Sequence, residues 1–93
     1  MTIIAIASYF CHCHLCTPSP PQPTASGAWP REGITVAGPR WVKLGTRVLI
    51  NGKPYVVQDR TARRWDGKRW DIFVSDHQRA KRLGIRKVKI TIP

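Results

Sequence analysis

Short runs of β-branched and aromatic residues, broken by glycine and proline, constrain the fold of this chain more than any other feature. These runs occupy residues 34–36, 47–50, 55–58, 70–74 and 86–92. In the last run Val and Ile occupy alternate positions, which predicts a strand with one buried and one solvated face. Strands of this spacing within 93 residues predict one small, mostly antiparallel barrel or sandwich of about five to seven strands.

Two local signals refine this prediction. Residues 51–54 read Asn-Gly-Lys-Pro between two apolar runs, which predicts a hairpin with a turn lengthened by the Lys-Pro pair. One short helix is expected over residues 78–83, because Ser75 or Asp76 supplies an N-cap and Gly84 supplies a left-handed C-cap. The expected fold class is therefore mainly β, with one short helix.

The first third of the chain differs in composition from the rest. Residues 1–30 contain no Lys, Arg, Asp or Glu. We expect residues 1–8 to form the first β-strand, residues 9–32 a Cys/His- and Pro-rich loop, and residues 33–93 the body of the barrel. The start lacks the basic segment of a signal peptide, and its apolar run is too short to span a bilayer, so no transmembrane segment is expected.

The charge of the chain limits its function. Sixteen Lys and Arg against five Asp and Glu give a formal net charge of +11. Four Asp and a single Glu exclude acid-rich metal designs such as an EF-hand or a carboxylate-bridged di-iron site. The positive excess favours a polyanionic partner, and charge alone does not choose among nucleic acid, a membrane surface and an anionic cell-wall polymer.

Three thiols and two imidazoles stand close together in the sequence Cys-His-Cys-His-Leu-Cys at residues 11–16. Cys11, Cys13, Cys16 and His14 are candidate ligands of a Cys3His zinc site. The spacing is not that of a standard zinc finger, and no second Cys-x-x-Cys follows. One disulfide with one remaining thiol, or three reduced thiols, are the alternatives, and the odd count argues against a fully oxidised secreted scaffold.

Several segments stand in an order that resembles a known domain. They read Leu-Gly-Thr-Arg-Val at 44–48, Tyr-Val-Val-Gln-Asp at 55–59, Arg-Trp-Asp-Ile-Phe-Val at 69–74 and Asp-His at 76–77. In this order the chain resembles the 3D (three-aspartate) domain of the double-psi β-barrel group, which includes the catalytic barrel of membrane-bound lytic transglycosylase A and rare lipoprotein A-like proteins. The resemblance covers residues 33–93 and implies a small six-stranded double-psi β-barrel with one short helix.

Two of the three aspartates of that pattern are present. Asp59 matches the second and Asp71 the third, whereas Gly38 stands where the first is expected. The resemblance implies cleavage of the β-1,4 bond between N-acetylmuramic acid (MurNAc) and N-acetylglucosamine (GlcNAc) of peptidoglycan. Asp71 would be the acid/base of this lytic transglycosylase reaction, and Asp59 a second carboxylate or a group that orients the sugar. Such a reaction requires no cofactor.

Further residues are expected to contact the glycan strand, namely Thr46, Trp70, Arg69 and His77. Without the resemblance, the two aspartates have a plainer interpretation. Asp59 and Asp71 are then exposed strand-end residues paired with Arg60 and Arg69. Both interpretations stay open at the level of the sequence.

Two rival functions remain beside the enzyme. One is a non-catalytic peptidoglycan-binding barrel, favoured by the replacement of the first aspartate by Gly38. The other is a basic nucleic-acid-binding β-barrel, because Trp65 and Trp70 stand among many Arg and Lys residues. We expect a monomer that acts in the cell wall or periplasm. Without a clear signal peptide, we expect synthesis in the cytoplasm and delivery by a phage holin or within a particle.

Overall fold

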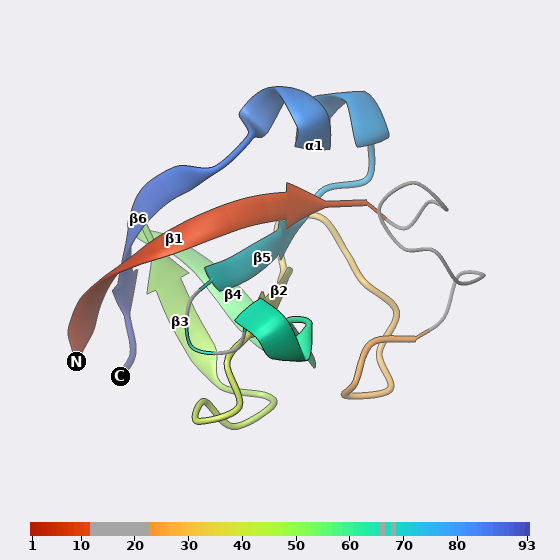
Figure 1. Ribbon diagram of the computed structural model, residues 1–93. Coiled ribbons are helices and arrows are strands. Elements are labelled where there is room, and N and C mark those ends of the chain that lie inside the picture. Colours follow the sequence, from red (N-terminus) through yellow and green to blue (C-terminus); the bar gives the residue numbers. More distant parts are fainter. Residues whose placement is uncertain (12–22, 66, 68) are drawn as a thin grey trace.

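The described part of the chain forms a small closed β-barrel with one short α-helix (Figure 1). The computed structural model describes residues 1–11, 23–65, 67 and 69–93. The strands in this part are β1 (Thr2–Phe10), β2 (Thr35–Gly38), β3 (Arg47–Ile50), β4 (Lys53–Arg60), β5 (Arg69–Phe73) and β6 (Arg86–Thr91). A single turn of 3-10 helix, η1 (Arg63–Trp65), precedes β5, and helix α1 (His77–Leu83) precedes β6. The predicted class, mainly β with six strands and one short helix, is confirmed.

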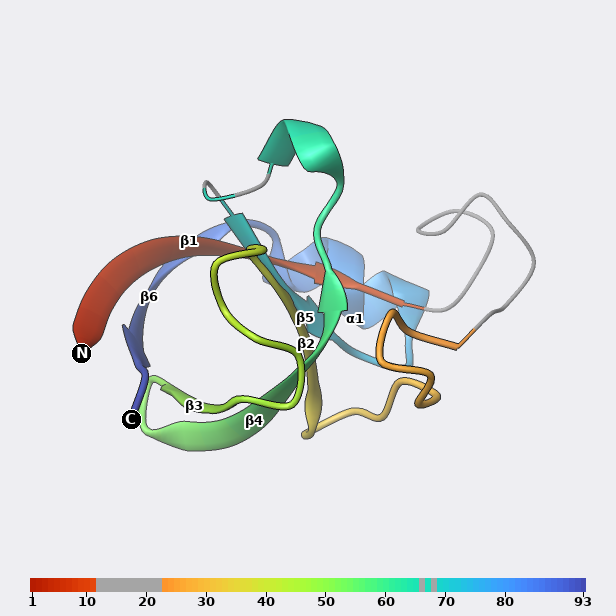
Figure 2. The ribbon, with the colours of Figure 1, turned by 90° about the horizontal axis from the view of Figure 1, so that it is seen from below.

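The strands follow one another around the barrel in the order β1-β5-β2-β4-β3-β6, and β6 pairs with β1 to close it. The view from below shows this ring (Figure 2). Two of the pairings, β1 with β5 and β2 with β4, are parallel. The sheet is therefore mixed. A parallel pair needs a long connection between its strands, which sequence alternation does not reveal.

Alternation along each strand separates a packed interior from the outer surface. The interior contains Ala7, Val36, Val42, Val48, Ile50, Val57, Trp70, Ile72, Val88 and Ile90. Residue 7 of β1 is buried, whereas the neighbouring residues 6 and 8 are partly exposed. Burial of this apolar set is the main stabilising contribution expected for so small a domain.

Strand β1 is longer than the predicted strand at residues 1–8. Tyr9 and Phe10 continue it, because they pair with Ile72 and Phe73 of β5. Phe10 and Phe73 also meet edge to face, with ring centroids 5.4 Å apart. Cross-strand aromatic contacts of this kind stabilise a sheet. Residues 2–10 thus contribute the whole of one barrel strand.

The hairpin between β3 and β4 turns more tightly than expected. Asn51 and Gly52 have φ angles of 50° and 82°, which are typical of a two-residue type I′ turn. Ile50 pairs directly with Lys53, so the Lys-Pro pair belongs to β4 and does not lengthen the turn. Pro54 is tolerated there because a strand position outside the hydrogen-bonding ladder needs no N–H.

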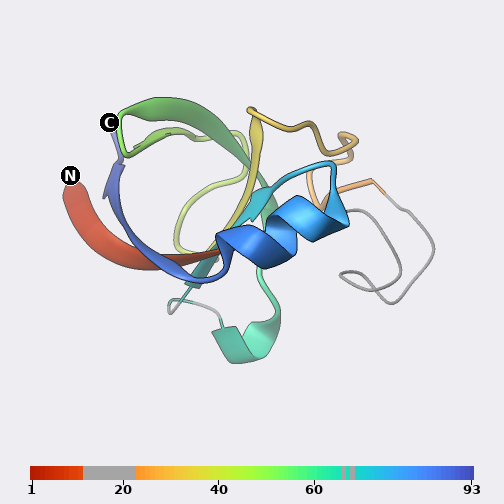
Figure 3. The same ribbon diagram turned by 90° about the horizontal axis from the view of Figure 1, so that it is seen from above.

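Helix α1 has both predicted caps. The Asp76 carboxylate accepts a hydrogen bond from the backbone N–H of Gln78 at 3.3 Å, and Gly84 ends the helix with a φ of 63°. Asp76, rather than Ser75, is therefore the N-cap. The helix packs against β1 (Figure 3). No helix in the described residues is long and apolar enough to cross a membrane.

Candidate functional site

The two predicted aspartates lie on the same outer face of the barrel. Ser8 of β1 is the register partner of Asp71 of β5, Asp71 that of Ala37 of β2, and Ala37 that of Asp59 of β4. We call these four residues the aspartate row. Residues in register on neighbouring strands share a face, and the spacing of strands places the Cα atoms of the two aspartates about 10 Å apart.

A β-bulge in β4 brings Asp59 into this row. Val36 pairs with Val57, but the next residue, Ala37, pairs with Asp59, so Gln58 is the extra residue. Without the bulge, alternation from the buried Val57 would direct Asp59 toward the interior. The side-chain carbonyl of Gln58 accepts a hydrogen bond from Thr35 Oγ1 at 2.6 Å, which holds the bulge against β2.

Asp71 is partly exposed and lightly engaged. Its carboxylate accepts a hydrogen bond from the hydroxyl of Ser8. Arg69 lies on the same face of β5, but its guanidinium stands over the ring of Trp65, 4.0 Å from the centroid. Among the residues that the structure describes, no cation forms an ion pair with Asp71. The described contacts therefore include no ion pair between Arg69 and Asp71, which the plainer interpretation of the sequence expected.

Asp59 is engaged differently, because its carboxylate is tied to backbone. Its Oδ1 accepts hydrogen bonds from the N–H of Ala25 at 3.1 Å and from the N–H of Arg60 at 2.9 Å. The Arg60 guanidinium turns away and donates to the carbonyls of Pro39 and Val42 at 2.7 and 2.6 Å. Asp59 thus fastens the turn at residues 24–28 to β4, and Arg60 fastens the loop that follows β2.

Trp70 lies on the opposite face of β5 from Asp71. Only 2% of its surface is exposed, and its ring fills the barrel interior. A Cβ atom added at Gly38 would lie 3.1 Å from Cζ3 of Trp70 and 3.2 Å from Cγ1 of Val57. Gly38 and Trp70 are therefore complementary in size, and the indole does not share the face of the aspartate row.

Thr46 and His77 lie outside the strand segments that form the aspartate row. Thr46 follows Gly45, whose φ of 93° forms a turn, and the Thr46 carbonyl accepts the N–H of Val57 at 2.9 Å. His77 is the first residue of α1, and its Nδ1 lies 3.6 Å from the Sγ of Cys11. The structure places neither residue in the register of the aspartate row.

A strip of apolar and basic residues lies on the outer face beside Asp71. Ile6 is the register partner of both Arg69 and Lys87, and Ile4 is that of Lys89. We call these five residues the basic-apolar strip. Ile4 is 70% exposed, which is unusual for a large apolar side chain in a strand. Ser8, Ile4 and Ile6 were not predicted from the sequence, although the period-two pattern of β1 contained the signal.

One end of the strip is hollowed. A cavity of about 290 Å³ is lined by Ile4, Ile6, Trp41, Trp70 and Lys87, among others. Trp41 follows β2 and is 55% exposed, so its ring offers an accessible aromatic surface next to the strip. Trp41, rather than Trp70, is therefore the exposed indole of this region.

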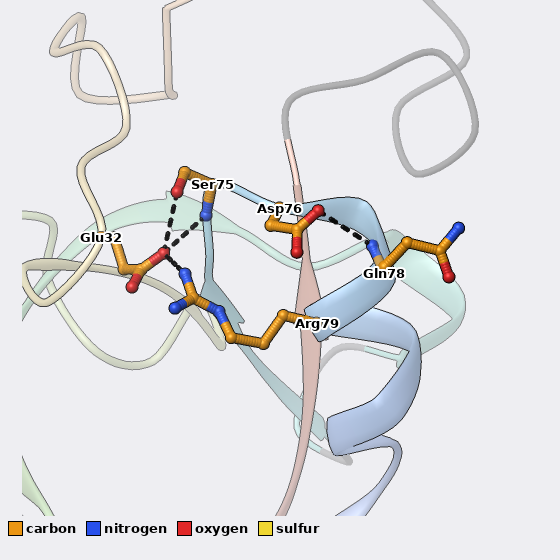
Figure 4. Close-up of polar contacts among 5 residues, drawn as sticks. All are labelled: Glu32, Ser75, Asp76, Gln78 and Arg79. Carbon is orange, nitrogen blue, oxygen red and sulfur yellow. Dashed lines mark hydrogen bonds and ion pairs between the residues drawn. The ribbon is translucent and has the colours of Figure 1, made fainter.

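A larger cavity, of about 630 Å³, lies at the α1 end of the barrel and includes Tyr9, Glu32, Tyr55 and Arg79 in its lining. Glu32 accepts hydrogen bonds from the N–H of Ser75 at 2.8 Å, from its hydroxyl at 3.0 Å and from Arg79 (Figure 4). These contacts, the Ser75 N–H foremost, hold the pKa of Glu32 below its ordinary value. Burial raises the pKa of the Tyr55 phenol, and the nearby Tyr9 and Glu32 add to the rise.

The predicted zinc ligands Cys13, His14 and Cys16 lie outside the described residues. Cys11 is buried at the end of β1. In the described part of the chain, no three His, Cys, Asp or Glu side chains gather closely enough to hold a metal ion.

Comparisons with known proteins add no further assignment. No protein-family model, no curated protein sequence and no solved structure matched this chain. The function is therefore inferred from the geometry of the outer face.

Proposed function

We propose that the chain is a peptidoglycan-cleaving enzyme of lytic transglycosylase type, built on a double-psi β-barrel of the 3D kind, with Asp71 as its acid/base. One observation carries this proposal. Asp71 stands on the outer face of a closed, mixed six-stranded barrel, partly exposed, with the hydroxyl of Ser8 as its hydrogen-bond donor. A carboxyl group that is reachable and not neutralised by an ion pair with a described residue is the group that this chemistry requires.

The reaction needs one carboxyl group. Asp71 in its acid form gives a proton to the glycosidic oxygen while the bond from that oxygen to C1 of MurNAc breaks. The resulting carboxylate then takes the proton of the MurNAc C6 hydroxyl, whose oxygen bonds to C1 and closes a 1,6-anhydro ring. Atoms and charge balance without water and without the second carboxylate of an ordinary glycosidase. Asp59 acts as a positioning residue, because its carboxylate is occupied by two backbone N–H groups.

The basic-apolar strip supports a glycan as the partner. Ile4 and Ile6 offer flat apolar surface to sugar rings, and Trp41 offers an aromatic face. Lys87 and Lys89 flank them and suit the carboxylates of peptide stems. The proposed complex is a monomer bound along a glycan strand in the wall or periplasm, and no cofactor takes part.

A specific observation also favours the non-catalytic binding module. In the pattern that the sequence resembles, an aspartate and an isoleucine occupy the positions of Gly38 and Trp70. Here a Cβ atom at Gly38 would already lie 3.1 Å from the indole of Trp70, closer than ordinary van der Waals contact, so an aspartate would fit only if the ring shifted. The chain thus lacks the first aspartate of the pattern and leaves little space for it, and binding without cleavage is the second candidate function.

Digestion of purified sacculi separates these functions. The wild-type chain is expected to release 1,6-anhydromuropeptides, identified by chromatography and mass spectrometry, and Asp71→Asn to release none. Asp76→Asn is the matched control, because it makes the same chemical change at a helix N-cap where Asn serves as well as Asp.

Each other outcome overturns part of the proposal. Full activity of Asp71→Asn would remove Asp71 from the role of acid/base. Pelleting with sacculi without any product, unchanged in Asp71→Asn, would identify the binding module. Salt-dependent binding of a single-stranded oligonucleotide with no affinity for sacculi would contradict both wall functions and favour the nucleic-acid-binding barrel.

A further inference from the structure

The large cavity at the α1 end of the barrel takes no part in the proposed glycan chemistry. Its volume of about 630 Å³ falls within the range of about 300–1,000 Å³ that is typical of small-molecule sites. Neither Asp71 nor any residue of the basic-apolar strip is among the described residues that line it. The cavity is therefore a second place at which a ligand can bind, separate from the outer face.

The floor of this cavity is one end of the barrel core. Ile50, Ile72 and Val88 line it, and each is at most 4% exposed. Tyr9 and Tyr55 line it from β1 and β4 and pack against the core. A sugar or another polyol would leave hydroxyl groups unpaired on the aliphatic floor, whereas a hydrocarbon chain gains by leaving water there. The floor therefore favours the apolar part of a ligand.

The rim of the cavity has an excess of positive charge. Lys53 and Arg86 are exposed lining residues from β4 and β6, and Arg79 lines the cavity from α1. Among the described lining residues only Glu32 is acidic, so three cations accompany one anion. Glu32 pairs with Arg79, and no described carboxylate forms an ion pair with Lys53 or Arg86. This balance of charge favours an anionic head group.

Hydrogen-bond donors at the rim suit a carboxylate. The Nε of Arg86 donates to the Leu83 carbonyl at 3.0 Å, which holds the guanidinium beside the end of α1 and uses none of its terminal N–H groups. The Nε of Arg79 is buried without a hydrogen-bond partner among the residues that the structure describes. Burial raises the pKa of Tyr55, so this phenol keeps its proton at neutral pH. A guanidinium binds a carboxylate through two parallel N–H···O bonds.

We propose that this cavity binds a small amphiphilic carboxylate. Its hydrocarbon chain lies against Ile50, Ile72 and Val88, and its head group lies at Lys53 and Arg86. The lining comes from strands on several sides of the barrel and from α1, so the site requires the closed fold. Binding does not depend on Asp71, so it can be tested whether or not the chain cleaves peptidoglycan.

Calorimetric titration of the full-length protein with decanoate tests this site. Decanoate is expected to bind saturably, one molecule per chain. Decanol, with a similar chain and no charge, and decyltrimethylammonium, with the opposite charge, are expected to bind at least about tenfold more weakly. Acetate, which lacks the chain, is not expected to bind. Nuclear Overhauser effects from the decanoate chain to the methyl groups of Ile50, Ile72 and Val88 would place it in the cavity.

A matched pair of variants tests the location independently of the ligand series. Leu83 lines the cavity and is only partly buried, so Leu83→Trp is expected to fill the cavity and abolish binding while the barrel still folds. Ile85→Trp makes a bulky substitution at a residue that is 63% exposed and outside the lining, and it is expected to keep wild-type affinity. Circular dichroism checks that both variants fold.

The rim is tested by removing one charge at a time. Lys53→Gln and Arg86→Gln are each expected to weaken decanoate binding by about threefold, as is usual for an exposed ion pair. Lys43→Gln is the control, because Lys43 is exposed and lies outside the lining.

Three results would overturn the proposal. The absence of saturable decanoate binding by the folded wild-type protein would remove the site. Equal affinity for decanoate and decyltrimethylammonium would remove the role of the rim cations. Nuclear Overhauser effects to Ile4 and Ile6 instead of Ile50, Ile72 and Val88, with full binding by Leu83→Trp, would place the chain on the basic-apolar strip.

Discussion

Strand β5 has two faces that serve different purposes. On the inner face, Trp70 and Ile72 are buried in the barrel core. On the outer face, Arg69 and Asp71 are partly exposed, and Asp71 meets only the hydroxyl of Ser8 among the described residues. Substitutions on the inner face should therefore change stability, and substitutions on the outer face should change function. Substitution of neighbouring residues, one on each face, tests this division.

Trp70→Ala gives the largest expected loss of stability. Removing a buried indole leaves a cavity and costs about 3–5 kcal/mol of unfolding free energy. Asp71→Ala, one residue away on the outer face, is expected to change it by less than about 1 kcal/mol. Urea unfolding followed by circular dichroism measures both, and Trp70→Phe serves as a milder variant if Trp70→Ala does not fold. Equal losses for Trp70→Ala and Asp71→Ala would abolish the distinction between the faces.

The strands were largely predictable from sequence. Runs of β-branched residues and their alternation are local properties, so they predicted the strands at residues 47–50 and 86–92 without tertiary information. The helix was predictable for the same reason, because Asp76 and Gly84 are local capping signals.

The aspartate row was not predictable in the same way. It depends on the register between strands and on the bulge at Gln58, which are set by contacts between residues far apart in sequence. The closeness of Cys11 and His77 has the same origin. Trp70 was expected to contact the glycan because tryptophan often stacks on sugars. Its ring instead packs in the core against Gly38, which has no side chain to occupy that space.

The contact between Gly38 and Trp70 tests the packing of the inner face. Gly38→Ala is expected to cost about 1–3 kcal/mol, since the new methyl group would press on the indole. In the Trp70→Phe background the indole atoms nearest Gly38 are absent, so the same substitution should cost less, with a coupling of about 1 kcal/mol. A double-mutant cycle by urea unfolding measures it, and equal costs in the two backgrounds would contradict direct contact.

Ser8→Ala tests the outer face at its one described contact with Asp71. Loss of the hydroxyl is expected to lower stability by about 1 kcal/mol or less, because water replaces the donor at a partly exposed site. Release of 1,6-anhydromuropeptides should fall by less than in Asp71→Asn, since the carboxyl group itself remains. Ser8→Thr keeps the hydroxyl and is the matched control. Complete inactivity of Ser8→Ala with normal folding would give Ser8 a direct part in the chemistry.

Glu32 differs from Asp71 in its partners. The Glu32 carboxylate accepts hydrogen bonds from Ser75 and Arg79, whereas Asp71 accepts one from Ser8. The pKa of Glu32 in the folded protein is lowered from 4.5, mainly by the Ser75 N–H. Its contribution to stability is therefore complete above about pH 5 and is lost as the pH falls through the lowered value. Loss of the Glu32 charge is expected to change stability less than the substitutions of Trp70, Gly38 and Ser8, since Glu32 is exposed and its charge is screened by salt.

Glu32→Gln measures this contribution without removing the side chain. The variant should melt below the wild type at pH 7, and the difference in melting temperature should narrow as the pH falls through the lowered pKa of Glu32, where the wild-type carboxylate takes up a proton. The sign follows from the lowered pKa, since acid removes a stabilising charge from the wild type alone. Added salt at pH 7 should narrow the gap as well. A gap that is unchanged by both acid and salt would mean that hydrogen-bond geometry, and not the charge of Glu32, joins the segment before β2 to α1.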